Sequence, residues 1–210
     1  MTLWWTLVTL CCALGCVASA APGPLVQTHK YKKSFRLTTF TRTRVQHLLK
    51  KYKEQQMGNV HFEDRSRRLR DLPLLSTDFY RWLSLSDWDR LHAAVGDMQA
   101  YWGMLERKRK QLEEEQREQM AVQATQSRLV HSIRHIQLYL QDLISQVSSQ
   151  VSTALTVIRP RCVPTPAHAD LTGKTVWDSR VEGYIILRDL DLYLTKLARD
   201  FLLLASKAHA

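Results

Sequence analysis

Apolar residues recur every three or four positions in four long stretches of the chain, the spacing that places one face of an α-helix against a core. No stretch shows the sustained alternation typical of a β-strand, so the pattern predicts an all-α protein. The clearest stretch covers residues 176–206. Its apolar stripe consists of Leu187, Leu190, Leu194, Leu197, Phe201 and Leu204.

Three further stretches predict helices over residues 34–57, 87–117 and 122–158, after a flexible basic segment over 21–33. In each of them the apolar residues mark the side expected to face the core. These residues are Leu37, Phe40, Leu48 and Tyr52 in the first helix, Trp88, Leu91, Val95, Met98, Trp102 and Leu105 in the second, and Leu129, Ile133, Ile136, Leu140, Leu143 and Val147 in the third.

Local signals mark the ends of these helices. Gly58 is a natural stop for the first helix. Ser86 with Asp89 resembles a capping box before the second helix, and Thr175 with Asp178 resembles one before the fourth.

The lengths of the connections predict the topology. The first and third connections are long, at roughly thirty and twenty residues, whereas the second is only a handful. Long links leave neighbouring helices parallel, and short links force them to be antiparallel. We therefore expect residues 34–210 to form a long-chain four-helix bundle of up-up-down-down topology, with the first two helices parallel to each other.

The first twenty residues predict a signal peptide. They contain no charged side chain, and an apolar run ends at Ala18-Ser19-Ala20, a typical cleavage signal. A signal anchor is the alternative, but the run is short for a membrane span. No second apolar run is long enough to cross a bilayer. We expect a secreted, extracellular protein without membrane insertion.

The chain is basic, with a formal net charge of +10. Four arginines of the first long loop (Arg65, Arg67, Arg68 and Arg70) make heparan sulfate a candidate partner by charge attraction. A solvated basic loop is the alternative interpretation.

The sequence lacks the motifs of catalysis and cofactor binding. It has no nucleophile elbow, phosphate-binding loop or zinc-finger spacing, so we expect no enzyme activity, cofactor or nucleic-acid partner. His131 and His135 have a spacing that can hold zinc, but a third ligand is missing, which favours a solvated helix face. Cleavage of the leader would leave Cys162 as the single cysteine, and therefore no internal disulfide.

Residues 76–105 carry a recognisable pattern, made of Ser76-Thr77-Asp78, Trp82, Leu85-Ser86, Asp89-Arg90-Leu91 and Gln99-Ala100-Tyr101. With this pattern the segment resembles the ciliary neurotrophic factor branch of the interleukin-6 cytokine family. The fourth helix, at Ala198-Arg199-Asp200-Phe201, is similar to the same region of cardiotrophin-like cytokine.

This resemblance implies a cytokine that bridges class I cytokine receptors. The expected partners are the shared signal transducer of the interleukin-6 family and a leukaemia-inhibitory-factor-type receptor, with an alpha receptor as a further candidate. Signalling would pass through JAK kinases to STAT transcription factors. In the family, exposed faces of the first and third helices bind the shared receptor at site II.

The family carries Phe-x-x-Lys at the start of the fourth helix, where it binds the leukaemia-inhibitory-factor-type receptor at site III. The matching residues here are Trp177 and Arg180, which keep an aromatic plate and a cation one helical turn apart. Trp177 falls roughly 130° from the core stripe, as expected for an interface anchor. The alternative is a tryptophan covered by the loop between the third and fourth helices.

The C-terminal half of the fourth helix is a candidate for site I, the alpha-receptor contact. Leu192, Lys196, Arg199 and Leu203 form a second outward stripe there. The complete candidate set is Leu192, Tyr193, Lys196, Arg199, Asp200 and Leu203.

Two other function classes remain open. One is an amphipathic lipid-binding protein similar to an apolipoprotein, although such chains show short repeats punctuated by proline. The other is a heparin-binding growth factor that uses different receptors.

Overall fold

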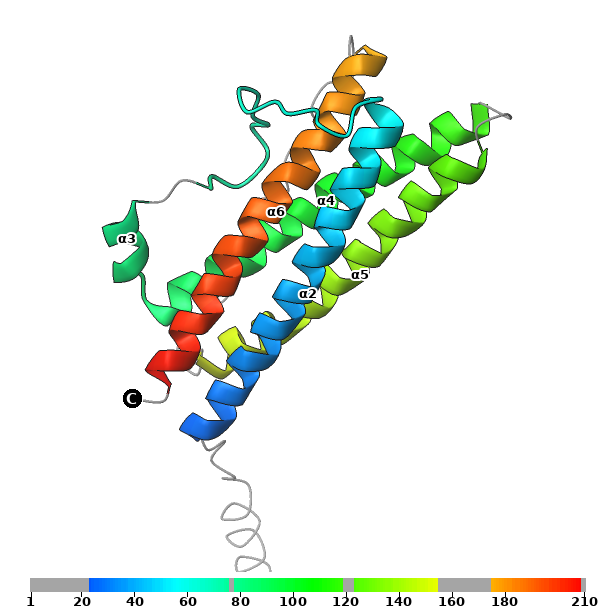
Figure 1. Cartoon of the computed structure of the whole chain (residues 1–210). Coiled ribbons are helices and arrows are strands. Elements are labelled where there is room, and N and C mark those ends of the chain that lie inside the picture. Colours follow the sequence, from blue (N-terminus) through cyan, green and yellow to red (C-terminus); the bar gives the residue numbers. More distant parts are fainter. Residues whose placement is uncertain (1–22, 76–77, 119–122, 155–174, 209–210) are drawn as a thin grey trace, which may run out of the picture.

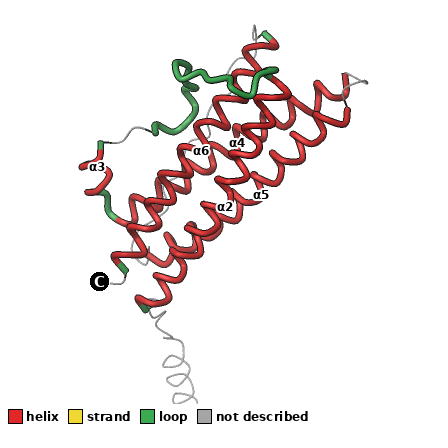
Figure 2. Tube along the Cα trace, in the orientation of Figure 1, coloured by secondary structure: helices red, strands yellow, loops and turns green. Residues whose placement is uncertain are grey.

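The computed structural model describes residues 23–75, 78–118, 123–154 and 175–208, and α-helices are the regular secondary structure in these ranges. Figures 1 and 2 show the long helices side by side, with a short helix to the side of them. The long helices are α2 (Pro24–Gln56), α4 (Asp87–Glu118), α5 (Gln123–Ala154) and α6 (Val176–Lys207), and the short one is α3 (Phe79–Ser84). The all-α class predicted from the sequence is therefore confirmed.

Helix α2 begins ten residues earlier than the sequence predicted, since residues 24–33 are helical and not a flexible segment. Proline is favourable at the first helical position, because its missing N–H group has no partner there. Thr28 and Tyr31 are buried and continue the core-facing side of α2 toward its start. This start of the helix was not predicted, because basic residues lie between Thr28 and Tyr31 and interrupt the apolar pattern.

The C-terminal end of α2 and the ends of the other long helices lie close to the predicted ones, as far as the described residues extend. Gly58 has φ +67° after the end of α2, a conformation that favours glycine. Thr175 and Asp178 form the predicted capping box of α6. The predicted residues 155–158 of the third helix lie outside the described residues.

Helix α6 packs antiparallel against both α2 and α4. Arg42 of α2 bonds Asp191, whereas Tyr52, further along α2, bonds the carbonyl of Arg180, earlier in α6. Two contacts show that α4 also runs antiparallel to α6. Arg90, near the start of α4, pairs with Asp200, whereas Lys108, further along α4, donates to Ser179 near the start of α6.

Helix α5 packs antiparallel against α2 and α4. Gln150 donates to the Ser34 hydroxyl over 3.0 Å, and Tyr139 meets Phe40, which follows Ser34 in α2. On the α4 side, Gln137 donates to Glu106 over 2.9 Å, and Figure 1 shows α5 running back in the opposite direction beside α4. The short connection between α4 and α5 is consistent with antiparallel packing of these two helices.

The predicted core stripes of α5 and α6 are buried throughout, whereas that of α2 is only partly so. Phe40, expected in the core, is 43% exposed. Thr38 and Thr41 are fully buried on α2, and their hydroxyls donate to the carbonyls of Ser34 and Leu37, each over 2.8 Å. This bond satisfies a buried threonine, so α2 packs with small polar residues that a hydrophobic pattern does not reveal.

Within the described ranges, none of the helices carries an apolar stretch sufficient to cross a bilayer.

Candidate functional site

The first turn of α6 is a rigid platform for Trp177 and Arg180. The Thr175 hydroxyl accepts from the backbone N–H of Asp178 over 3.1 Å, and the Asp178 carboxylate accepts from the N–H of Thr175 over 3.3 Å. The hydrogen bond from the Thr175 side chain is the main cause that lowers the pKa of Asp178. This box satisfies N–H groups that the end of a helix would otherwise leave free.

Trp177 lies on the outside of α6, as the sequence predicted, and is 47% exposed. The edge of its ring system meets Phe62 of the first loop (residues 57–75), with centroids 6.0 Å apart and planes at 87°. Phe62 in turn packs edge-on against Tyr184 of α6, at 5.0 Å. Trp177 is therefore supported on one side by the first loop and keeps about half of its side chain exposed. The loop between α5 and α6, which the alternative interpretation placed over Trp177, lies outside the described residues.

Two side chains from neighbouring helices hold the turn below Trp177 and Arg180. The Tyr52 hydroxyl donates to the carbonyl of Arg180 over 3.0 Å. The Lys108 ammonium donates to the carbonyl of Ser179 over 2.8 Å and to its hydroxyl over 2.9 Å. The Arg180 side chain is exposed, so its guanidinium and the open face of Trp177 are both available to a partner.

The candidate residues in the C-terminal half of α6 separate into exposed and buried groups. Leu192 and Arg199 are exposed, and Lys196 and Leu203 are half-buried. Tyr193 is 1% exposed and donates to the carbonyl of Ala94 over 3.2 Å, so it cannot contact a receptor directly in this arrangement.

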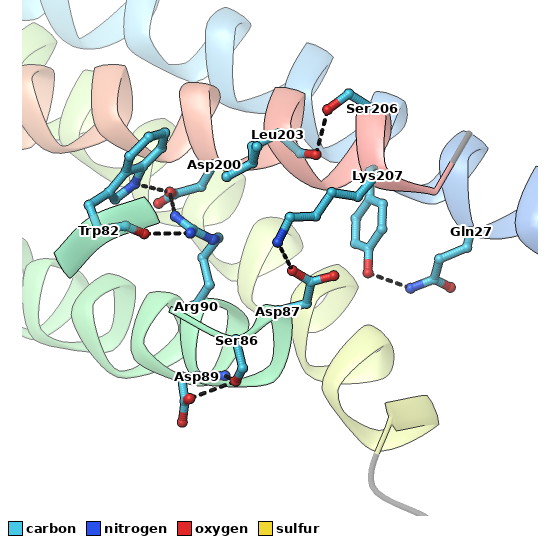
Figure 3. A network of polar contacts seen from close by, with 11 residues as sticks. Gln27, Trp82, Ser86, Asp87, Asp89, Arg90, Asp200, Leu203, Ser206 and Lys207 are labelled. Atoms are coloured by element: carbon cyan, nitrogen blue, oxygen red, sulfur yellow. Dashed lines mark hydrogen bonds and ion pairs between the residues drawn. The ribbon is translucent and has the colours of Figure 1, made fainter. Parts of the chain in front are cut away.

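Asp200 is also buried, and it connects three helices. Its carboxylate accepts from Arg90 of α4 and from the indole N–H of Trp82 of α3, both over 2.6 Å (Figure 3). Arg90 also donates to the carbonyl of Trp82 over 2.6 Å. The sequence analysis placed Asp200 on a contact surface, whereas the structure makes it the residue that fastens α3 to α4 and α6.

The fastened helix α3 presents an apolar surface that the sequence analysis missed. Phe79 is 62% exposed, Tyr80 78% and Leu83 46%. Helix α3 itself is held at the C-terminal half of α6, because its Trp82 donates to Asp200. The signal was present in the sequence as three large apolar residues close together in a segment between the expected helices.

A further exposed cluster lies where α2 and α5 meet. Phe40 packs edge-on against Tyr139 with centroids 5.2 Å apart, and the Arg44 guanidinium lies 5.0 Å from the Phe40 ring. Leu138, next to Tyr139 in the sequence, is 51% exposed. The sequence analysis placed no residue on this surface, because it assigned Phe40 to the core.

The four arginines of the first loop do not form one uniform basic strip. Arg65 pairs with Glu63 at 3.0 Å, and Arg67 pairs at 3.5 Å with both Asp64 and Asp178. The other two, Arg68 and Arg70, are exposed and have no acidic partner in the described part of the chain.

No protein-family model matches the chain, and no curated protein matches it either.

The described residues contain no group of three metal-ligating side chains. His131 and His135 meet edge-on, with ring centroids 4.2 Å apart and planes at 61°, on an exposed face of α5. Cys162 lies outside the described residues. The exposed aromatic and cationic clusters are thus the features from which a function is best argued.

Proposed function

We propose that this protein is a secreted helical cytokine that acts by binding, without catalysis. It bridges the shared signal transducer of the interleukin-6 family and a leukaemia-inhibitory-factor-type receptor, with an alpha receptor as a further candidate subunit. The bridged receptors then activate JAK kinases and STAT transcription factors.

The proposed topology is the up-up-down-down bundle of long-chain cytokines. It is supported by the packing directions of the long helices, because α2 and α4 each run antiparallel to α6 and to α5. The long first loop also fits a chain that returns to start α4 in the direction of α2.

The observation that carries the proposal is the open face of Trp177 above a fixed helical turn. Tryptophan and arginine are the residues most enriched at interface hot spots. The capping box and the bonds from Tyr52 and Lys108 hold this turn in place before any partner arrives. A site that is ordered in advance loses less conformational entropy on binding.

Exposed aromatic residues lie at separate places on the protein, which supports the proposal that it binds several receptors. Trp177 and the α3 surface lie near opposite ends of α6, about 35 Å apart at 1.5 Å per residue between positions 177 and 200. We assign Trp177 and Arg180 to site III, and the α3 surface with Arg199 and Leu203 to site I. The cluster of Phe40, Arg44, Leu138 and Tyr139 is assigned to site II, the contact with the shared receptor.

STAT phosphorylation in cells that carry defined receptor combinations tests this function. We expect a signal only where the shared transducer and a leukaemia-inhibitory-factor-type receptor are both present. Trp177→Ala should weaken the signal, whereas the neighbouring Val176→Ala, at a 67% exposed position, should not. Failure of the folded wild-type protein to signal in every combination would refute the proposal.

A sharp cooperative melting transition without lipid is expected for the same protein. A helical protein that melts broadly and becomes ordered only on lipid would instead fit the apolipoprotein class.

A further inference from the structure

A groove of about 910 Å³ lies between the first loop and the helices α2 and α6. This volume falls within the range of small-ligand sites, roughly 300–1,000 Å³. Leucines from all three segments form much of its wall. These are Leu49 of α2, Leu69, Leu72, Leu74 and Leu75 of the loop, and Leu192 of α6.

The acidic residues of the groove are already neutralised by arginines. Each of its three carboxylates has an arginine partner within 3.0 Å, which leaves little negative charge to repel an anion. The pairs are Glu63 with Arg65, Asp189 with Arg188, and Asp191 with Arg42.

Three cations of the groove have no such partner among the described residues. Arg68 and Arg70 line it from the loop and are exposed. Lys53 lines it from α2, with its ammonium 5.6 Å from the centre of the Tyr184 ring. After the ion pairs are counted, the groove therefore combines an apolar wall with an excess of positive charge.

An apolar wall together with an excess of positive charge limits the kinds of ligand that fit the groove. A sulfated sugar would use the positive charge but has no apolar body to cover the leucines. A neutral lipid would cover the leucines but would leave the arginines without a partner. A carboxylate accepts two parallel hydrogen bonds from one guanidinium, and these charge-assisted bonds are among the stronger ones in proteins.

We propose that this groove binds a long-chain fatty acid, with the acyl chain along the leucines and the carboxylate at Arg68 and Arg70. This site is independent of the receptor surfaces proposed above, and its test needs no receptor. It also gives the basic first loop a role different from the binding of heparan sulfate.

Isothermal titration calorimetry with oleate, below its critical micelle concentration, tests the site on the purified secreted chain. We expect saturable binding of one oleate per chain. Leu192→Asp should weaken binding at least about tenfold, because it places a negative charge on the apolar wall. Leu202→Asp is the matched control: Leu202 is 52% exposed and Leu192 51%, both on α6, but only Leu192 lines the groove.

A second pair of variants tests the charged end. Arg68→Glu with Arg70→Glu should weaken oleate binding about tenfold, whereas Lys32→Glu with Arg36→Glu, the same change of charge on exposed positions of α2, should leave it unchanged. Neutral monooleoylglycerol should bind more weakly than oleate. The proposal fails if oleate does not saturate, if Leu192→Asp behaves like Leu202→Asp, or if a heparin fragment binds at Arg68 and Arg70 while oleate does not.

Discussion

Tyr52 of α2 approaches Gly183 of α6 so closely that a side chain at position 183 would force Tyr52 and Lys108 to move. A Cβ atom on Gly183 would lie 2.6 Å from Cζ of Tyr52, nearer still to its hydroxyl oxygen, and 2.7 Å from Cε of Lys108. This notch lets the Tyr52 hydroxyl reach the carbonyl of Arg180 and lets Lys108 reach Ser179. The Tyr52 hydroxyl is a donor at physiological pH, and burial raises its pKa further above the ordinary value of 10.0.

The first prediction concerns Gly183→Ala. In an ordinary helix this change stabilises the fold by roughly 0.5–1 kcal/mol, because alanine loses less backbone entropy. At the notch it should instead destabilise by about 1–3 kcal/mol, since Tyr52 and Lys108 must both move. Gly103→Ala is the control, because a Cβ there would meet nothing within 4 Å. Urea unfolding of both variants should give opposite signs, and equal stabilisation would contradict the close packing.

The second prediction concerns the buried pair of Arg90 and Asp200. Asp200→Ala should destabilise by about 3–5 kcal/mol, because it leaves the guanidinium buried without its carboxylate. The exposed pair of Asp87 and Lys207, at 2.8 Å near the same end of α6 (Figure 3), is the control. Asp87→Ala should cost no more than about 1 kcal/mol. Denaturant titrations measure both values.

A combined variant separates the pair from the helix that it fastens. Arg90→Met with Asp200→Leu should cost less than Asp200→Ala alone, because no buried charge is left unpaired. Trypsin should nevertheless cleave more readily at Arg81, since α3 loses the bonds of Trp82 to both residues. Unchanged cleavage would show that other contacts hold α3.

The sequence predicted the helices well where large aliphatic residues face the core. The stripes of α5 and α6 are leucine-, isoleucine- and valine-rich, and their burial follows directly from the helical period. Helix α2 was predicted less well because Ser34, Thr38 and Thr41 fill its buried side. A hydroxyl that bonds its own backbone costs little to bury, and no hydrophobicity pattern records that bond.

The outward position of Trp177 at the candidate site was predictable from the sequence, but its contacts with other residues were not. The helical period placed Trp177 outside the core, and the structure agrees. Its contact with Phe62 was not predictable, because it depends on the path of a loop. The burial of Tyr193 and Asp200 could have been inferred from the helical period. Each lies three residues after one core leucine and four residues before another.

The third prediction concerns the pH dependence of stability through Asp97 of α4. Burial is the main cause that raises its pKa above the ordinary value of 3.8; Lys196 lowers it, and Asp200 raises it further. The folded protein therefore binds this proton more tightly than the unfolded chain does. Stability from this group is present below pH 3.8 and is lost as pH rises through the raised pKa.

Asp97→Asn should consequently be more stable than the wild type at pH 7, and this advantage should shrink as the pH falls toward 3.8. Asp178→Asn is a control of opposite sign, because the Thr175 hydroxyl lowers the pKa of Asp178. It should be less stable than the wild type at pH 7, with the difference vanishing in acid. Thermal unfolding from pH 7 to well below pH 3.8 measures both, because the effect of Asp178→Asn vanishes only as the pH falls through the lowered pKa of Asp178. A pH-independent effect of Asp97→Asn would contradict the assignment.

The last prediction separates the folding role of Trp177 from its binding role. Trp177→Ala removes one edge-on aromatic contact, so it should cost about 0.5–1.5 kcal/mol of stability, well below the 3–5 kcal/mol of a core aromatic. The same change should weaken binding to the leukaemia-inhibitory-factor-type receptor by about 2 kcal/mol or more, the scale of an interface hot spot. Arg180→Ala should lose less, and the double variant should be non-additive because both side chains share one contact. Melting curves and surface plasmon resonance on the purified variants measure the two effects. If Trp177→Ala is strongly destabilised while its folded fraction keeps wild-type receptor affinity, Trp177 serves only to support the first loop.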